Sequence, residues 1–365
     1  MSCLLIIEDL WMPMARSLDL QNLQQTLQMH LQTHNCCGTC ELNLLAHGEA
    51  NVIFQLNQTA LVRVAVNTPN QRFAGDLRRL TQFEQLILQY LEGTEIGHVL
   101  QSTQLQPTDD FPYTYLITNY LPGESLDYSR SDLQKCAKTL AQLHRLPQQR
   151  GYAIDSLMGY LPVVRQPLKL FFQESQTYVQ PYLESPDAEP EIVEMLHHLL
   201  KAAAAKLSAQ RSLEEQPYLC LVHSDHTYEN WVINDRQAHL IDWEWAEIGS
   251  PAGDLGHFLS PVTIHRRQGY RLPSSDRTFF LNCYYEALAD ERLITTIQTH
   301  FAAFGVYPAV RSLCWTAGYW VTANLWYEDA QSSPSAAERL SRFRQSREQF
   351  PALWREVMAW LEGGA

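Results

Sequence analysis

The strand-like segments of this chain follow one another in its first third, and this order limits its fold more than any other feature. Three short runs rich in branched and apolar residues are separated by turn formers: ELNLLAHG at 41–48, ANVIFQLN at 50–57 and ALVRVAV at 60–66. Such runs predict three successive antiparallel strands. A further apolar run, YTYLITNYLPG at 113–123, predicts a strand that ends in a Pro-Gly break.

Helical periodicity surrounds these strands. Residues 17–33 place four leucines at three- and four-residue steps, which is the stripe of an amphipathic helix: Leu20, Leu23, Leu27 and Leu31. Residues 77–93 are similar, with apolar side chains on one face and Gly93 as a stop signal. From Ser131 onward the chain is largely helical, and one compact β-like segment at 218–241 interrupts it.

The element order predicts an α+β fold with two lobes. We expect an N-terminal helical extension at 1–37 and an N-lobe at 38–121, built on a small antiparallel β-sheet with one main helix. A large, mostly helical C-lobe would occupy 122–365. Ligand sites favour clefts between domains. Architecture by itself does not name a function, which has to be argued from particular residues.

Composition and charge exclude several functions. The 365 residues include 40 acidic and 27 basic side chains, and the net charge of −13 argues against a general nucleic-acid binder, which would need a basic surface. No run approaches the roughly 18 apolar residues of a membrane helix. The N-terminal run MSCLLIIEDLWMPM is broken by Glu8 and Asp9 and fails as a signal peptide. The sequence therefore predicts a cytoplasmic protein with no membrane partner.

A cluster of histidine and cysteine residues lies at the end of the first predicted helix and just beyond it: His30, His34, Cys36, Cys37 and Cys40. A structural zinc site usually has two paired-ligand knuckles, and the second knuckle is missing here. In a reducing cytosol we expect no disulfide framework among the eight cysteines. Ordinary thiols and surface histidines are therefore the favoured interpretation, with a metal site as the alternative.

The segment most informative about chemistry is LVHSDHTYENWVINDRQAHLIDWEWAEIGSPAGDLGHF, residues 221–258. WVIN and AHLID predict two short strands joined by a turn. A hairpin centred on Arg236 pairs residues whose numbers sum to 472, which would place Asn230 opposite Asp242 with Cβ atoms roughly 5 Å apart. Oxygen ligands at that separation, with Asp225 five residues upstream, suit Mg²⁺.

The pattern H-x-D-x₄-N, followed by an Asp twelve residues later, resembles the catalytic and metal-binding loops of protein kinase-like phosphotransferases. The context I-D-W-E around the second Asp and the later S-P-A-G-D-L-G-H are similar to the aminoglycoside phosphotransferase/choline kinase family. The resemblance covers most of the chain and is strongest at 44–143 and 221–258. It implies a bilobal protein kinase-like fold with ATP and Mg²⁺ as cofactors.

The resemblance also implies roles for individual residues. Asp225 would be the base that accepts the proton of a substrate hydroxyl, and His223 would organise the loop. Asn230 and Asp242 would hold Mg²⁺, while Asp254 would be a buried anchor for the loop backbone.

A kinase-like site needs a cation on the third strand, paired with a glutamate on the helix. No lysine precedes Lys135, so Arg63 in the middle of ALVRVAV is the available substitute. Arginine offers a planar fork, so its phosphate contacts would be bidentate. Glu84 lies on the inward side of its helix and would pair with Arg63, because an unpaired inward carboxylate is costly to bury. The alternative is a surface arginine whose stem lies along the sheet.

Other cofactor-binding residues follow from position in the family pattern. The phosphate-covering loop would be 46–51, in which Gly48 and Asn51 match a sparse G-x-x-N. The strand at 113–123 would be the hinge, and its adenine contacts would come from the backbone of four residues: Thr118, Asn119, Tyr120 and Leu121.

Two residues depart from the family pattern. Ser224 stands where the family mostly has Gly, which is a small change. Glu229 precedes Asn230 where Gly is frequent, and its charge would either alter Mg²⁺ affinity or point to solvent.

We therefore expect an ATP- and Mg²⁺-dependent phosphotransferase that moves the γ-phosphate to a hydroxyl of a small molecule, such as an aminoglycoside, an amino alcohol or a sugar. Two alternatives stay open: a catalytically inactive kinase fold serving as a scaffold, and a kinase that acts on protein, which the lack of a D-F-G/A-P-E activation segment disfavours. A hydrolase is excluded because the adjacent His223, Ser224 and Asp225 cannot converge as a triad.

The acceptor could be cationic. Aromatic residues recur at helical spacing in the C-lobe, and two more flank Asp242: Trp315, Tyr319, Trp320, Trp326 and Tyr327, with Trp243 and Trp245. Aromatic faces in a negative overall field would suit an amine or a quaternary ammonium group. The alternative is that these side chains form core, as aromatics at helical spacing usually do.

Overall fold

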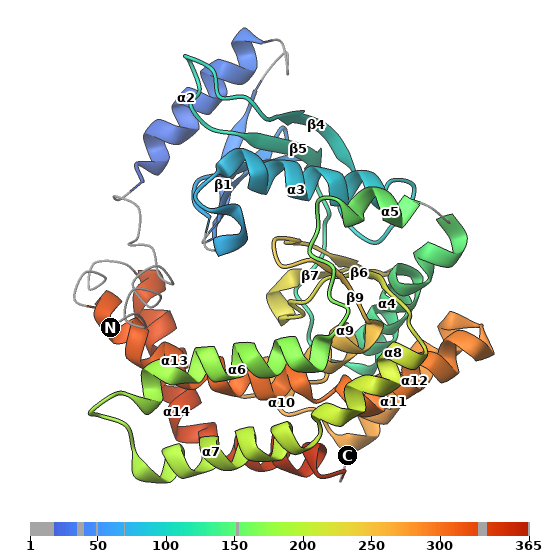
Figure 1. Cartoon of the computed structure of the whole chain (residues 1–365). Coiled ribbons are helices and arrows are strands. Elements are labelled where there is room, and N and C mark those ends of the chain that lie inside the picture. The colour runs from blue at the N-terminus through green and yellow to red at the C-terminus, as the bar shows by residue number, and fades with distance from the viewer. Residues whose placement is uncertain are drawn as a thin grey trace. The chain divides into compact units, whose positions relative to one another are not determined.

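The structure is a computed structural model that describes residues 18–34, 40–48, 50–68, 70–150, 153–327 and 334–363 (Figure 1). The chain divides into two compact units. Unit 1 contains the residues up to Gly123 together with His239–Trp245, and unit 2 contains Glu124–Ala238 and the residues from Ala246 onward. The segment His239–Trp245 therefore lies in unit 1, whereas the sequence predicts a C-lobe that runs unbroken over 122–365.

Unit 1 is built on a five-stranded antiparallel sheet in the order β1-β2-β3-β5-β4. Its strands are β1 (Leu42–His47), β2 (Asn51–Leu56), β3 (Ala60–Ala65), β4 (Leu100–Gln104) and β5 (Tyr115–Asn119). The three successive strands and the later apolar strand are confirmed. Strand β4 is missing from the prediction because its sequence, LQSTQ, has a polar, largely unburied edge pattern.

Helices α2 (Leu20–Thr33) and α3 (Leu77–Tyr90) cover opposite faces of this sheet (Figure 1). Successive side chains of a strand point to opposite faces. Accordingly, Val62 and Val64 of β3 share a buried cluster with the leucine stripe of α2, while Arg63 between them faces Glu84 of α3. Strand β3 is therefore buried along its whole length.

Each of the two helices begins at an aspartate that caps it. Asp19 accepts hydrogen bonds from the backbone N–H groups of Gln21 and Asn22, and Asp76 accepts from those of Arg78 and Arg79. Such caps satisfy N–H groups that have no partner within the helix.

Unit 2 is mostly helical, as predicted. Its long helices are α4 (Arg130–Arg150), α6 (Pro167–Leu183), α7 (Pro190–Ala205), α11 (Ser274–Leu288), α12 (Glu291–Phe304), α13 (Tyr307–Tyr327) and α14 (Pro334–Leu361). Its shorter helices are α5 (Ala153–Met158), α8 (Gln210–Glu215), α9 (Pro251–Phe258) and α10 (Pro261–His265). A core cluster joins side chains of α6, α7, α13 and α14. In the described part of the chain, no helix is both long enough and apolar enough to span a membrane.

Short strands and turns carry the segment that the sequence singles out. Strand β6 (Cys220–Val222) pairs antiparallel with β9 (Glu247–Gly249) in unit 2. Strands β7 (Trp231–Ile233) and β8 (Ala238–Leu240) form the predicted hairpin. Its turn closes with the Asn234 N–H donating to the Gln237 carbonyl, so the centre lies between Asp235 and Arg236. The predicted sum of 472 is therefore wrong by one, and it no longer pairs Asn230 with Asp242.

Two expectations about the histidine and cysteine cluster are wrong. Cys40 is disulfide-bonded, although the sequence predicts ordinary thiols. His30 is buried rather than at the surface, because α2 turns it toward the Phe111 ring and the β4–β5 loop. Cys36 and Cys37 lie outside the described residues.

Helix α2 should contribute measurably to stability. Leu27 is fully buried, so Leu27→Ala should lower the free energy of unfolding by about 3 kcal/mol, because it leaves a cavity in a packed core. Met29 on the same helix is 60% exposed, so Met29→Ala should change it by less than about 0.5 kcal/mol. Urea titration followed by circular dichroism would measure both. Equal midpoints for the two variants would contradict this role of the leucine stripe.

Candidate active site

A buried arginine and two carboxylates form the charged centre of unit 1. The Arg63 Nη2 atom lies 2.8 Å from Glu84 Oε1 and donates a hydrogen bond of 3.2 Å to Asp242 Oδ1. Arg63 and Glu84 are almost fully buried, whereas the Asp242 side chain is 41% exposed. The predicted Arg63–Glu84 pair is present, and the alternative of a surface arginine is wrong.

Electrostatics keep this arginine charged. Burial opposes the charge, but Glu84 and Asp242 together outweigh that effect and raise the pKa of Arg63. Burial also raises the pKa of Glu84, and the attraction of Arg63 only partly offsets this. The two N–H donors of the Nη2 group can hold both carboxylates. The Nε atom of Arg63 is buried without a hydrogen-bond partner among the described residues.

The segment that carries Asp242 is fixed to unit 1 by close backbone contacts. The Leu240 N–H donates to the Ile96 carbonyl at 2.7 Å, and a Cβ on Gly97 would come within 2.9 Å of the Leu240 carbonyl oxygen. Only glycine allows that approach. Asp242 itself has φ of 65°, in the left-handed region that non-glycine residues rarely adopt. Strain of this kind is common at functional sites.

His98 is a buried neighbour of this centre that the sequence analysis does not single out. Burial, reinforced by the charge of Arg63, lowers the pKa of His98 to about 3, so its ring is neutral. Its Nδ1 atom lies 3.0 Å from the carbonyl oxygen of Asn119, to which it donates. Only the fold brings His98 near Arg63.

Asp225 and Asn230 form the polar centre of unit 2. The Asn230 Nδ2 group donates to both the carbonyl oxygen and the Oδ2 atom of Asp225, each at 2.9 Å. Both amide hydrogens are thereby directed to Asp225, which leaves the Asn230 Oδ1 atom as an acceptor for another group. The Asp225 side chain is 29% exposed, so its carboxylate remains accessible.

Asp254 anchors the loop that carries Asp225, as the resemblance predicts. It is fully buried, and its two carboxylate oxygens accept hydrogen bonds from the backbone N–H groups of His223 and Ser224, at 3.0 and 2.9 Å. His144 Nε2 and His226 Nε2 lie 3.1 and 2.9 Å from the same carboxylate. Burial alone would raise the pKa of Asp254, but these imidazoles hold it well below its usual range.

His223 is fully buried, and its Nδ1 atom accepts a hydrogen bond of 3.4 Å from the backbone N–H of Asp225. This contact lies within the loop that carries Asp225, and the role of His223 as its organiser stays a prediction. Glu229 is exposed, which favours the interpretation that its charge points to solvent.

His257 is a second residue that the sequence analysis does not single out. Its Nδ1 atom accepts a hydrogen bond of 3.0 Å from the His226 backbone N–H, so Nε2 must carry the ring proton. That Nε2 atom lies 4.0 Å from Asp225 Oδ1. Burial lowers the pKa of His257 well below its usual range, so the ring is neutral. The only sequence signal was its place at the end of the D-L-G-H motif.

The predicted phosphate loop is short. Ala46 and His47 belong to β1, Asn51 begins β2, and the Gly48 N–H donates to the Asn51 carbonyl at 2.9 Å. A Cβ at Gly48 would meet only that oxygen, at 3.5 Å, so space does not require glycine there. Residue 49 lies outside the described residues.

Hydrogen bonds within unit 1 already occupy some backbone groups of the predicted hinge, which leaves fewer groups available to bind adenine. The Asn119 N–H donates to the Val99 carbonyl, and the Tyr120 N–H donates to the Thr59 carbonyl. Thr118 is fully buried in β5. Among the described residues, no such partner is found for the Tyr120 carbonyl or for the N–H and carbonyl groups of Leu121.

The aromatic residues divide into core and partly exposed side chains. Trp243 in unit 1 and Trp320 in unit 2 are buried, as core packing predicts. Trp315 and Tyr319 stack on one another with ring centroids 4.8 Å apart and are partly exposed. The side chains of Trp326 and Tyr327 lie outside the described part of the chain.

The sequence of this chain is similar to that of a known protein family. The model of the phosphotransferase enzyme family matches residues 41–281. No curated protein is similar enough in sequence to count as a match.

Three solved structures illustrate the likeness in fold. A Ralstonia eutropha protein assigned to the aminoglycoside phosphotransferases has a TM-score of 0.59 at 14% identity, covering 92% of this chain and 98% of that one. The GDP complex of aminoglycoside 2′-phosphotransferase-IIIa has a TM-score of 0.54 at 15% identity, covering 89% and 99%. A choline/ethanolamine kinase family protein from Mesorhizobium loti has a TM-score of 0.51 at 15% identity, covering 92% and 99%. These likenesses confirm the predicted α+β, kinase-like fold.

The backbone at Ser224 yields a testable prediction. Its φ of 66° lies in the left-handed region, which favours glycine, the residue mostly found there in the family the sequence resembles. Ser224→Gly should therefore raise the free energy of unfolding by about 0.5–1 kcal/mol. Ser208→Gly, at an exposed position with ordinary φ, should not stabilise the protein. Thermal unfolding of both variants would measure these changes. A loss of stability in Ser224→Gly would contradict the proposal that the backbone at Ser224 is strained.

Proposed function

Because this chain belongs to the phosphotransferase enzyme family, we propose that it transfers the γ-phosphoryl group of ATP to a hydroxyl group of a small molecule. The single observation that carries the proposal is the Asp225–Asn230 arrangement. A carboxylate is held by an amide and a buried anchor, yet is accessible to a substrate. A scaffold without activity would have no need to keep that carboxylate exposed.

Asp225 is the proposed base. The acceptor hydroxyl oxygen bonds to the γ-phosphorus, the bond from that phosphorus to the β,γ-bridging oxygen breaks, and the hydroxyl proton passes to the Asp225 carboxylate as ADP leaves. Asn230 orients the carboxylate through its Oδ2 atom, and His223 and Asp254 are positioning residues that hold the loop backbone. His257 directs its Nε2–H toward the Oδ1 atom of Asp225, 4.0 Å away.

Mg²⁺ fits the donors that the chain offers. Asn230 Oδ1 and the Asp242 carboxylate are the proposed ligands, and both are hard oxygen donors of the kind Mg²⁺ prefers. When bound with the nucleotide, the ion would neutralise charge on the phosphates. Asp242 now contacts Arg63, so we propose that it exchanges this partner for the metal when Mg-ATP binds.

Arg63 is the proposed phosphate-binding cation of unit 1, held in place by Glu84. Release of Asp242 would free a donor of the guanidinium for the nucleotide phosphates, and a planar fork suits bidentate contact with phosphate oxygens. Gly48 and Asn51 would border the same phosphates. The adenine would contact the hinge through the Tyr120 carbonyl and the Leu121 N–H, since the neighbouring N–H groups are already used.

The proposed acceptor carries amine groups. Aminoglycoside phosphotransferases and a choline/ethanolamine kinase family protein are among the structures with this fold, and both names refer to acceptors with amines. A net charge of −13 would attract cationic molecules. A panel of aminoglycosides, amino alcohols and neutral sugars, assayed for nucleoside diphosphate release with ATP and with GTP, would identify the acceptor class and the donor.

Substitutions of Asp225 and of Asp242 should affect different steps, turnover in the first case and nucleotide binding in the second. Asp225→Asn should lower kcat by about 10²–10⁴-fold with little change in Mg-ATP affinity, because a proton acceptor acts on the hydroxyl. Asp242→Ala should weaken Mg-ATP binding itself, because it removes a metal ligand. Calorimetry and steady-state kinetics would separate these effects.

The control for this pair is Asp235→Asn, in the exposed hairpin turn, which should match the wild type in both measurements. Equal loss of nucleotide affinity in Asp225→Asn and Asp242→Ala would overturn the division of roles. A wild-type protein that binds no Mg-ATP would favour a non-catalytic role.

The hinge assignment can be tested at one backbone atom. Leu121→Pro removes the N–H that we propose for adenine, so the KM for ATP should rise by about tenfold, the equivalent of one hydrogen bond. Leu121→Ala keeps the N–H and should leave the KM within about twofold. Steady-state kinetics would measure both, and an unchanged KM in Leu121→Pro would place the adenine elsewhere.

A further inference from the structure

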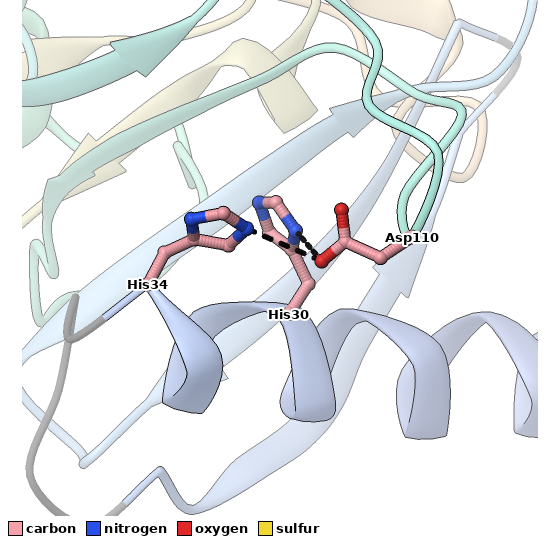
Figure 2. Close-up of side chains that lie close together, drawn as sticks. All are labelled: His30, His34 and Asp110. Carbon is pink, nitrogen blue, oxygen red and sulfur yellow. Dashed lines mark hydrogen bonds and ion pairs between the residues drawn. The ribbon is translucent and has the colours of Figure 1, made fainter.

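A second cluster of metal-ligand side chains lies in unit 1, on elements that the proposed reaction does not use. His30 and His34 occupy successive turns of α2, and Figure 2 shows both rings directed at the carboxylate of Asp110, in the β4–β5 loop. His30 Nδ1 and His34 Nε2 lie 2.8 and 3.2 Å from the same oxygen, Asp110 Oδ2. One ligand atom from each residue falls within 4.8 Å of the others.

His30 is the buried member of the cluster, and its ring nitrogens have several polar neighbours. The ring is 1% exposed, and oxygen atoms lie beside both of its nitrogens. Nδ1 lies 2.8 Å from Asp110 Oδ2, and Nε2 lies 3.1 Å from Gln104 Oε1 and 3.3 Å from the Tyr115 hydroxyl. A neutral imidazole carries one N–H and can satisfy only one acceptor. With that proton on Nε2, the Nδ1 lone pair lies 2.8 Å from Asp110 Oδ2, an arrangement that a cation between the two atoms would stabilise.

We propose that His30, His34 and Asp110 bind a divalent late first-row metal ion, of which Zn²⁺ is the representative. Two imidazole nitrogens and one carboxylate oxygen are ligands that Zn²⁺ accepts, whereas Mg²⁺ prefers an all-oxygen shell. Tetrahedral ligands at about 2.1 Å from an ion are about 3.4 Å apart, so small shifts of the observed 2.8 and 3.2 Å pairs would admit it.

Neighbouring side chains already orient the ligands. With its proton on Nε2, His30 donates to Gln104 Oε1 at 3.1 Å, and Nδ1 then has the lone pair that a metal requires. The Phe111 ring stacks on His30 with centroids 5.2 Å apart and holds its plane.

The exposed side of the cluster gives the ion access and an open coordination position. The side chains of His34 and Asp110 are 49% and 45% exposed, so water or a small ligand could complete the shell. The ion would join the end of α2 to the β4–β5 loop. Besides its leucine stripe, α2 contacts the sheet through hydrogen bonds from Gln24 and Gln28 to the backbone oxygens of Leu42 and Cys40. Metal binding should therefore stabilise unit 1.

The test uses the full chain, freed of metal with a chelator that is then removed. Titration with Zn²⁺ in a calorimeter should give one site per chain, and Co²⁺ should give visible d–d absorption typical of four-coordinate nitrogen and oxygen ligation. Zn²⁺ should also raise the Tm. His34→Gln and Asp110→Asn should each weaken Zn²⁺ binding at least tenfold and abolish the rise in Tm, and neither should unfold the protein because both positions are half exposed.

Two exposed residues of the same types, an aspartate and a histidine, serve as matched controls. Asp109→Asn changes the exposed carboxylate next to Asp110, and His197→Gln changes an exposed histidine on α7, so both should bind Zn²⁺ as the wild type does. The proposal is overturned if the wild type binds no stoichiometric Zn²⁺. It is also overturned if His34→Gln and Asp110→Asn keep wild-type affinity, or if a cobalt–thiolate charge-transfer band persists in them, since the ligands would then be cysteines.

Discussion

The buried carboxylate of Asp254 is the interaction on which the reactive loop of unit 2 depends. It accepts two consecutive backbone N–H groups, from His223 and Ser224, and lies against two imidazoles in a site closed to water. A buried charge is tolerated only when it is fully hydrogen-bonded, so this network allows few alternative loop conformations. The left-handed backbone at Ser224 persists because Asp254 holds the N–H groups on that turn. Because Asp225 is the next residue, its backbone position is fixed by the same hydrogen bonds.

Unit 1 contains a buried charge of the opposite sign, the guanidinium of Arg63. Arg63 sits in the middle of a strand that is buried on both faces, so its charge requires partners within the unit. Glu84 supplies a permanent partner and Asp242 an exposed one. Removing either carboxylate would leave a buried charge partly uncompensated, which is far more costly than losing a surface ion pair. Glu84 therefore holds the Arg63 guanidinium in place even where Asp242 takes another partner.

Much of the fold and part of the site could be predicted because the signals are local. Short apolar runs rich in branched residues indicated β1 to β3 and β5, and the leucine stripe indicated α2, because each signal lies within a few consecutive residues. Asp225 and Asn230 could be named because they share one short loop. The polar edge strand β4 had no such signal, since an edge strand with neither face fully buried needs no apolar alternation. His98 and His257 matter through neighbours distant in sequence, and no local pattern records those contacts.

The sequence by itself determined the order of the elements, the membership of the phosphotransferase family and the residue types at the proposed reaction site. It also predicted that Arg63 pairs with Glu84, because no lysine precedes Lys135 and Arg63 lies mid-strand. Only the tertiary structure decided that His239–Trp245 joins unit 1, and that Asp110 meets His30 and His34 across 80 and 76 positions of sequence. The physical reason is that helical and strand periodicity arise from interactions within a few residues. Contacts between distant segments depend instead on how packing of the whole sheet against α2 positions a connecting loop.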